Sequence, residues 1–255
     1  MIGKSLRRFL GYFGALSRLA YEVFTRLFSR PFGMTTFLSQ CETIGVRSVP
    51  IGLLILFFVG LVFALQFGVT LTAMGAVPYV GRVTGLSIVR ELGPVFTSLV
   101  VGGRVGAGMA AELGSMRVTE QIDAIRALGA DPIKKLVVPR VLAATLVLPI
   151  VCLFAVLSGI FGGMLVSNLQ FDLSWTFFFK SVVNTVRATD FASGFFKPFF
   201  FGFGIAIIGC YEGLTCGFGT TGVGRAATRT VVNISVMVVL VDFALTKAFT
   251  LLPRI

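Results

Sequence analysis

Long apolar runs constrain the fold of this chain more than any other feature. One of them, roughly Pro50 to Thr72, contains no charged residue and includes IGLLILFFVGLVFAL. About 20 apolar residues cross a bilayer as a helix, whereas a transmembrane barrel alternates polar and apolar residues over short segments. Only 13% of the residues are charged, against about 25% in soluble domains, so apolar surface must face something other than water. We therefore expect an all-α polytopic membrane protein.

We expect about five membrane spans in a single membrane domain, with an interfacial region at 1–45 and a transmembrane bundle at 46–255. In the fourth span, Lys197-Pro198 is expected to interrupt the helix. Phe177–Phe179 is either part of a loop or a helix on the far membrane face. The expected spans are Pro50–Thr72, Thr84–Ala111, Val141–Val166, Phe191–Tyr211 and Thr230–Leu252.

The segment Ser5–Phe28 has the pattern of an amphipathic, basic helix. Its apolar residues recur at a period of 3.6, with arginines and a lysine between them, which suits a helix lying in the headgroup plane. The alternative is a helix packed on a soluble partner. The apolar set is Leu6, Phe9, Leu10, Phe13, Leu16, Ala20, Phe24, Leu27 and Phe28.

The basic residues predict the orientation. The net charge is +11, which in a membrane protein indicates cytoplasmic loops facing anionic lipid rather than nucleic-acid binding. The basic residues concentrate in the N-terminal segment, the Glu112–Arg140 loop and the Gly213–Arg229 loop. The positive-inside rule places these three segments in the cytoplasm, and five spans then place the C-terminus outside.

Several kinds of chemistry are excluded or disfavoured. The chain has no histidine, which removes the commonest general base and most zinc sites, and its four cysteines form no CxxC pair. We expect no metal and no cofactor, and a membrane-embedded lipid enzyme is disfavoured. A GxGxxG match at Gly217–Gly222 follows a membrane span rather than a strand, so we interpret it as chance. The sequence contains no Walker A motif, so the chain cannot itself be an ATPase of that class.

A polar stripe runs along the second span. Thr84, Ser87, Glu91, Pro94 and Ser98 share one face of an ideal helix, and glycines at 102 and 106 continue it with a GxxxG spacing that lets another helix approach. An ionisable group inside a membrane is a functional candidate by default, so Glu91 is a candidate functional residue.

Two cationic residues accompany this acid. Arg90 is its neighbour but points about 100° away on an ideal helix, and Lys197, in a span of opposite direction, is a plausible counter-charge. The alternative is that Arg90 and Glu91 lie near the outer interface and snorkel.

A short helix is predicted at Thr119–Gly129. Thr119 can cap it, and Gly129 with Pro132 stops it. One side is apolar and the other is charged, which is typical of a docking surface for a cytoplasmic partner; the alternative is a solvated connector. The apolar residues are Ile122, Ile125 and Leu128, and the charged residues are Glu120, Asp123 and Arg126.

Three segments carry a family resemblance: ELGPVFTSLVVGGRVGAGMAAELGSMRVTEQIDAIRALGADP (Glu91–Pro132), LVVPRVLA (Leu136–Ala143) and TGVGRAATRTVV (Thr221–Val232). The sequence resembles the MlaE/YrbE family of ABC-transporter permeases, which move phospholipid between the Gram-negative membranes. Thr220-Thr221 departs from the acidic residue that the family often has just before the last segment. The resemblance covers nearly the whole chain.

The resemblance implies a non-catalytic subunit of the inner membrane. It implies a homodimer with a lipid cavity at the dimer interface, where Arg90, Glu91 and Lys197 lie near the headgroup. A separate cytoplasmic ATPase would dock on Thr119–Leu128, with a STAS-domain protein bound to that ATPase and a periplasmic MCE-domain hexamer forming the lipid tunnel. The expected function is phospholipid transport that maintains outer-membrane lipid asymmetry. The alternative is a secondary transporter driven by protons through Glu91 and Asp242.

Overall fold

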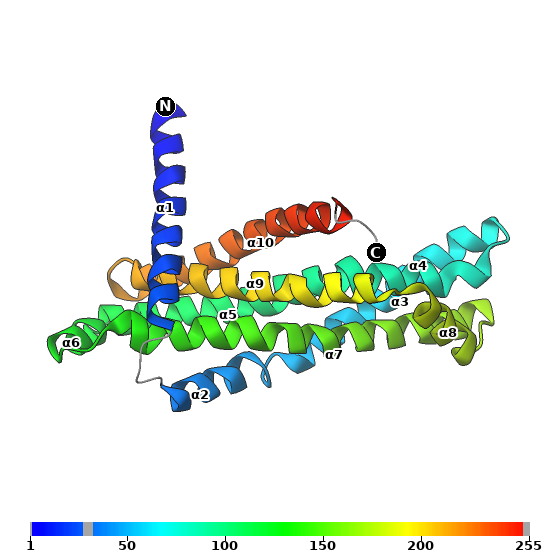
Figure 1. The fold of residues 1–255 in the computed structure, drawn as a ribbon, viewed down its shortest axis with the longest axis horizontal. Helices are drawn as coiled ribbons and strands as arrows, with labels where there is room; N and C mark the ends of the chain where they lie inside the picture. Colours follow the sequence, from blue (N-terminus) through cyan, green and yellow to red (C-terminus); the bar gives the residue numbers. More distant parts are fainter. Residues whose placement is uncertain (1, 28–32, 252–255) are drawn as a thin grey trace.

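The computed structural model describes residues 2–27 and 33–251, and within them every regular element is helical (Figure 1). This confirms the all-α fold. The elements are α1 (Ile2–Leu27), α2 (Met34–Ile44), α3 (Val49–Ala73), the 3-10 turn η1 (Val77–Tyr79), α4 (Val80–Ser87), the π-helical turn η2 (Ile88–Leu92), α5 (Gly93–Val118), α6 (Gln121–Ala127), the π-helical turn η3 (Ile133–Val137), α7 (Val138–Phe171), α8 (Trp175–Thr185), α9 (Ala188–Leu214) and α10 (Gly219–Leu251).

Five helical segments in the described part of the chain are long and apolar enough to cross a membrane, which confirms the expected number of spans. The helices extend beyond the predicted ends because hydropathy marks only the part in the bilayer, while backbone hydrogen bonding continues outside it. Leu252, the predicted end of the last span, lies outside the described residues. The five segments are Met34–Ala73, Val77–Val118, Ile133–Phe171, Ala188–Leu214 and Gly219–Leu251.

Three sequence-based expectations about connections are wrong. The helix α9 continues through Lys197-Pro198 without interruption, because a proline inside a membrane helix is tolerated where neighbouring groups compensate. Most of the expected Gly213–Arg229 loop is helical, since α10 already begins at Gly219. The expected Glu112–Arg140 loop is also mostly helical, because α5 continues to Val118 and η3 begins at Ile133.

Two short helices complete the bundle. The segment containing Phe177–Phe179 forms the helix α8 rather than a loop, and it buries Phe178 while Phe177 and Phe179 stay exposed. The helix α2 has no counterpart among the predicted elements. It packs against α7 and precedes α3 after a short bend (Figure 1). Together α2 and α3 span Met34–Ala73, about 60 Å of helix, roughly twice the thickness of a bilayer core.

The helix α1 is confirmed and runs crosswise to the bundle (Figure 1). Its buried residues are Leu19 and Val23, which contact the bundle core, whereas Leu10, Phe13 and Phe24 of the predicted apolar face are exposed. Phe28 lies outside the described residues, as do the side chains of Leu6 and Phe9. An exposed apolar face on a basic helix is what binding to a membrane surface requires.

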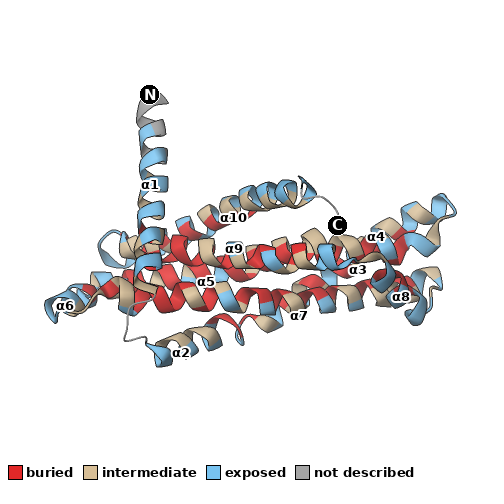
Figure 2. Ribbon diagram, viewed as in Figure 1, coloured by how far each residue is buried: buried red, intermediate tan, exposed pale blue. Residues whose placement is uncertain are grey.

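Glycines set the closest helix crossings. Where α3 crosses α7, a methyl group on Gly60 would collide with the backbone of Gly159. Where α5 crosses α9, a methyl group on Gly209 would lie 2.9 Å from the carbonyl oxygen of Gly106. The predicted packing role of Gly102 and Gly106 is therefore confirmed. Buried residues gather on α5, α7 and α9, whereas α10 is largely exposed (Figure 2).

Candidate functional site

The site is built on a break in the second span. The π-helical turn η2 carries both Arg90 and Glu91, and such turns insert one extra residue and are frequent at functional sites. The insertion changes which neighbours the span faces. Before the turn, Thr84 contacts Gly163 of α7, and after it Gly102 faces Ile205 of α9. The polar stripe predicted on an ideal helix is therefore not continuous, because the π-helical turn rotates the part of the span after it relative to the part before it.

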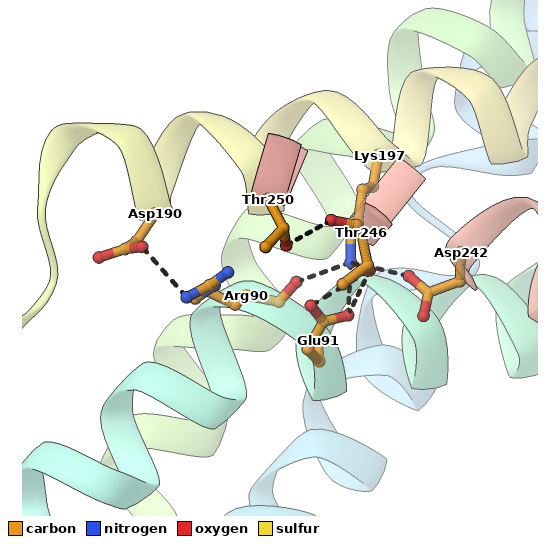
Figure 3. Close-up of polar contacts among 7 residues, drawn as sticks. All are labelled: Arg90, Glu91, Asp190, Lys197, Asp242, Thr246 and Thr250. Carbon is orange, nitrogen blue, oxygen red and sulfur yellow. Dashed lines mark hydrogen bonds and ion pairs between the residues drawn. The ribbon is translucent and has the colours of Figure 1, made fainter. Parts of the chain in front are cut away.

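Lys197 of α9 is the centre of the site (Figure 3). Its side chain is fully buried, and its ammonium group forms an ion pair with Glu91. The same nitrogen donates to Asp242 Oδ1 at 2.8 Å, to Thr246 Oγ1 at 2.8 Å and to the carbonyl oxygen of Arg90 at 3.3 Å. The prediction that Lys197 is the counter-charge of Glu91 is confirmed. The three N–H groups of a lysine are fully used by these acceptors.

Residues of α10 complete the network. Thr246 Oγ1 donates to the Glu91 carboxylate at 3.3 Å, and Thr250 Oγ1 donates to the carbonyl oxygen of Thr246 at 2.7 Å. The side chain of Asp242 is 20% exposed and that of Glu91 is 36% exposed. One lysine therefore connects three helical segments, and the two acids that it holds remain accessible from one side.

A second ion pair lies beside the first. Arg90 Nη1 is 3.6 Å from Asp190 Oδ1. Asp190 also accepts a hydrogen bond from the backbone N–H of Arg187 at 3.1 Å, which caps α9. Arg90 and Glu91 thus point to different partners, as an offset of about 100° between adjacent residues predicts. The sequence pattern does not single out Asp190, because it predicts a loop at this position.

The cluster lies deep along the spans. Lys197 is nine residues from the start of α9, and Asp242 is nine residues from the described end of α10. At 1.5 Å per residue, each of these residues lies about 14 Å inside its helix. Glu91 turns toward the buried Lys197, whereas Arg90 turns toward Asp190, two residues from the start of α9 (Figure 3). The geometry therefore opposes the snorkelling alternative for Glu91 but not for Arg90.

The expected docking helix is present as α6, but its cap differs. Thr119 Oγ1 donates to the carbonyl oxygen of Ser115 at 2.9 Å and so belongs to the last turn of α5. Glu120 takes the cap position with φ 59°, and no side chain caps α6. The predicted Thr119 cap is wrong because α5 extends further than expected. The predicted stop is confirmed, since Gly129 has φ 76°.

The predicted apolar and charged sides of α6 are present, but the apolar side faces the bundle, and Leu128 is exposed instead of lying with it. Ile122 is buried in the core of its own chain and Ile125 is partly buried, so these residues attach α6 to the bundle. Leu128 is exposed, and Asp123 forms an exposed ion pair with Arg126 at 3.0 Å. The surface that α6 offers outward is charged, with Leu128 as its apolar contact.

Two further polar clusters were not predicted. Arg140 of α7 is 3% exposed; its Nη2 is 2.9 Å from Glu112 Oε2 of α5, and its Nη1 donates to the carbonyl oxygen of Leu136 at 2.6 Å. The sequence pattern predicts a loop for both charged residues. Each directly flanks an apolar run, and this position is the signal that could have indicated a helix.

The other cluster attaches α1. Asn233 Nδ2 of α10 donates to Glu212 Oε1 of α9 at 3.0 Å and to Tyr12 Oη of α1 at 2.9 Å. Burial, then the nearby Glu212 carboxylate, raise the pKa of Tyr12. Within residues 2–27 and 33–251, no group of acids and cysteines has the arrangement of a metal site.

The fold and the site define a class: a polytopic helical membrane protein with an ionisable network at membrane depth, an arrangement typical of transport proteins. The chain belongs to the family described as Permease MlaE, whose profile matches residues 37–248, and it is therefore an ABC-transporter permease.

Relatives match most of the chain. A probable ABC transporter permease protein of Rickettsia prowazekii is 38% identical over 98% of this chain and 96% of its own length. The intermembrane phospholipid transport system permease protein MlaE of Haemophilus influenzae is 33% identical over 94% of each chain. The chloroplastic protein TRIGALACTOSYLDIACYLGLYCEROL 1 of Arabidopsis thaliana is 38% identical over 91% of this chain and 66% of its own length.

Proposed function

We propose that this permease moves phospholipids between the inner and outer membranes and so maintains outer-membrane lipid asymmetry. The polar network around Lys197 carries the proposal, because it places charged groups at membrane depth next to exposed apolar helix faces. The Haemophilus relative, named as a phospholipid transport permease, supports the cargo. The chain is not an enzyme in this scheme, since its sequence has no Walker A motif and a partner hydrolyses ATP.

Arg90, Glu91 and Lys197 form the headgroup site with different roles. Arg90 and Glu91 are partly exposed and contact the headgroup, whereas Lys197 is buried and positions the acids. The test is ATP-driven lipid movement in vesicles that contain the complete complex. Glu91→Gln should lower the transport rate while assembly is retained. Asp172→Asn is a matched control, because Asp172 is exposed with φ 52°, a conformation that asparagine tolerates. Normal transport by Glu91→Gln removes the headgroup role.

The ATPase docks on α6 through Glu120, Asp123, Arg126 and Leu128, while Ile122 and Ile125 hold α6 on the bundle. Movement of the ATPase is transmitted along α5, which connects α6 directly to the π-helical turn. Arg126→Glu should abolish co-purification of the ATPase, whereas Lys180→Glu on α8 should not. Retained ATPase binding by Arg126→Glu contradicts the docking role.

The chain functions as one permease unit in a homodimer that encloses the lipid cavity. The largely exposed apolar face of α10 supports this arrangement, since its buried residues within one chain are only Ala226, Thr230, Ile234 and Val238. A STAS-domain protein binds the ATPase, and an MCE-domain hexamer covers the periplasmic side. The protein lies in the inner membrane with its N-terminus in the cytoplasm and its C-terminus in the periplasm. Cysteines introduced at Val232 should crosslink two copies if α10 lies at the dimer interface.

The proton-driven alternative has one structural observation in its favour, since Glu91 and Asp242 both pair with Lys197. The same vesicles distinguish the two mechanisms. The ATP-driven mechanism requires the ATPase subunit and nucleotide, whereas a secondary transporter moves lipid with the permease alone and a pH gradient.

A further inference from the structure

The cluster around Lys197 contains more acid than base. Among the described residues, the cationic side chains that pair in this cluster are Arg90 and Lys197, and the acidic ones are Glu91, Asp190 and Asp242. When all five are ionised, one negative charge is in excess. An unbalanced charge at this depth is unfavourable unless a cation or water compensates it. The resting site is therefore suited to a ligand that brings a positive group.

The donors and acceptors of the cluster that have no partner among the described residues show where such a ligand can bind. Lys197 has no exposed surface and no spare donor, so it cannot contact a ligand directly. Asp242 uses only Oδ1, and its Oδ2 has no partner among the described residues. The guanidinium of Arg90 has only the long contact from Nη1 to Asp190, and the Arg90 side chain is 28% exposed. The cluster thus offers one carboxylate oxygen without a partner, several unused guanidinium N–H donors, and the partly exposed Glu91 carboxylate, which already accepts from Lys197 and Thr246.

These unused groups lie on opposite sides of Lys197. Figure 3 shows Arg90 on the side of Asp190, and Asp242 on the other side of the Lys197 ammonium group. A guanidinium binds phosphate through charge-assisted hydrogen bonds, and a carboxylate oxygen accepts from an ammonium N–H. The site therefore has the charge pattern of a receptor for a zwitterion that carries both groups.

We propose that this site selects phospholipids with a primary ammonium headgroup, whose phosphate binds Arg90 and whose ammonium donates to Asp242 Oδ2. This inference rests on the proposed phospholipid transport. A glycerol headgroup offers no cation and leaves Asp242 Oδ2 unpaired. A choline headgroup carries the charge but has no N–H to donate, so it binds less tightly. The expected order is ethanolamine, then choline, then glycerol headgroups.

The test is a competition on the assembled complex with its ATPase. The complex is placed in vesicles with equal amounts of ethanolamine, choline and glycerol phospholipids of the same acyl chains. Retained lipid is then quantified by mass spectrometry after mild-detergent extraction, and ATP-driven movement is measured for each headgroup. Retained ethanolamine lipid should exceed glycerol lipid on the order of tenfold, the ratio that one charge-assisted hydrogen bond gives.

Variants separate the local contact from the total charge. Asp242→Asn should reduce the enrichment to the vesicle ratio, and Asp172→Asn should leave it unchanged. Asp190→Asn removes one negative charge but leaves Asp242 Oδ2 in place, so the ethanolamine preference should persist. If Asp190→Asn removes the preference as fully as Asp242→Asn does, the specific contact is wrong.

The competition with the native complex decides the inference even if a variant fails to assemble. Equal retention of the three headgroups, together with ATP-driven transport, overturns the headgroup selection and leaves the proposed function intact. The absence of ATP-driven movement for every headgroup overturns the proposed function itself.

Discussion

Lys197 and Arg140 are both buried cations, but their surroundings differ. Lys197 contacts two carboxylates, a hydroxyl and a carbonyl oxygen, and all of its donors are used. Arg140 contacts one carboxylate and one carbonyl oxygen, and its Nε is buried without a partner in the described part of the chain. The acid that Arg140 holds, Glu112, is 55% exposed.

The difference separates a site from a structural contact. Around Lys197 the acids depend on the lysine for compensation, and three helical segments meet there. Around Arg140 the acid is already exposed, and the ion pair joins only α5 and α7. Lys197 balances more than one acid and so holds charged groups in place for a ligand. Arg140 pairs with a single exposed acid and so only holds two helices together.

The largest effect is expected from Lys197→Met. The substitution leaves two carboxylates close together without their cation, and loss of one partner of a buried ion pair costs on the order of 3 kcal/mol. Thermal unfolding in nanodiscs should show this loss. The combined variant with Glu91→Gln and Asp242→Asn should recover most of it. A native-like unfolding temperature for Lys197→Met means that the acids do not need the lysine.

A smaller effect is expected from Arg140→Met, about 1–2 kcal/mol, because the exposed Glu112 carboxylate can be hydrated. The replacement also removes a buried Nε that has no partner. The same unfolding assay measures the effect, and the headgroup competition should be unchanged. A loss as large as that of Lys197→Met, or a changed headgroup preference, removes the distinction between the two cations.

Thr246→Val tests the hydroxyl that connects α10 to the site. The substitution removes one acceptor of the Lys197 ammonium group and one donor to Glu91, at a cost of about 1 kcal/mol. Thr246→Ser keeps the hydroxyl and serves as the control. Equal unfolding temperatures for the valine and serine variants mean that the hydroxyl adds nothing to the cluster.

The sequence could predict which residues are unusual but not most of their partners. Glu91 and Lys197 stand out because ionisable groups are rare in apolar runs. Their pairing was a reasonable inference from opposite charge. The contacts of Asp190 and Thr246 depend on how α9 and α10 align with the second span, and spacing within one helix does not contain that alignment.

The fold, like the site, could be predicted from the sequence only in part. Five spans were predictable because each needs a long apolar run. The π-helical turn was not, because one inserted residue leaves no mark in composition, yet it determines which helices Thr84 and Gly102 face. Glu112 and Arg140 were assigned to a loop because polarity was interpreted as the end of a helix, although α5 continues past Glu112.

The smallest effect is expected where an ion pair is accessible to water, as for Arg26 of α1 and Asp131 beside α6. Burial raises the pKa of Asp131, but hydrogen bonds from Arg26 and from the backbone N–H of Ile133 outweigh it, so the pKa is lowered overall. A lowered pKa means that the folded state favours the carboxylate. The stabilisation is thus present above the unfolded pKa of about 3.9 and is lost as the pH falls through the folded pKa.

Arg26→Gln should therefore lower stability by less than about 1 kcal/mol at neutral pH, because exposed ion pairs contribute little. The stability difference between Arg26→Gln and the native protein should vanish in acid below the folded pKa of Asp131. The stability difference caused by Arg140→Met should not change as Asp131 becomes protonated. Unfolding measured across this pH range checks both expectations. If the Arg26→Gln difference at neutral pH reaches that of Lys197→Met, solvent access is not what separates the strong ion pairs of this protein from the weak ones.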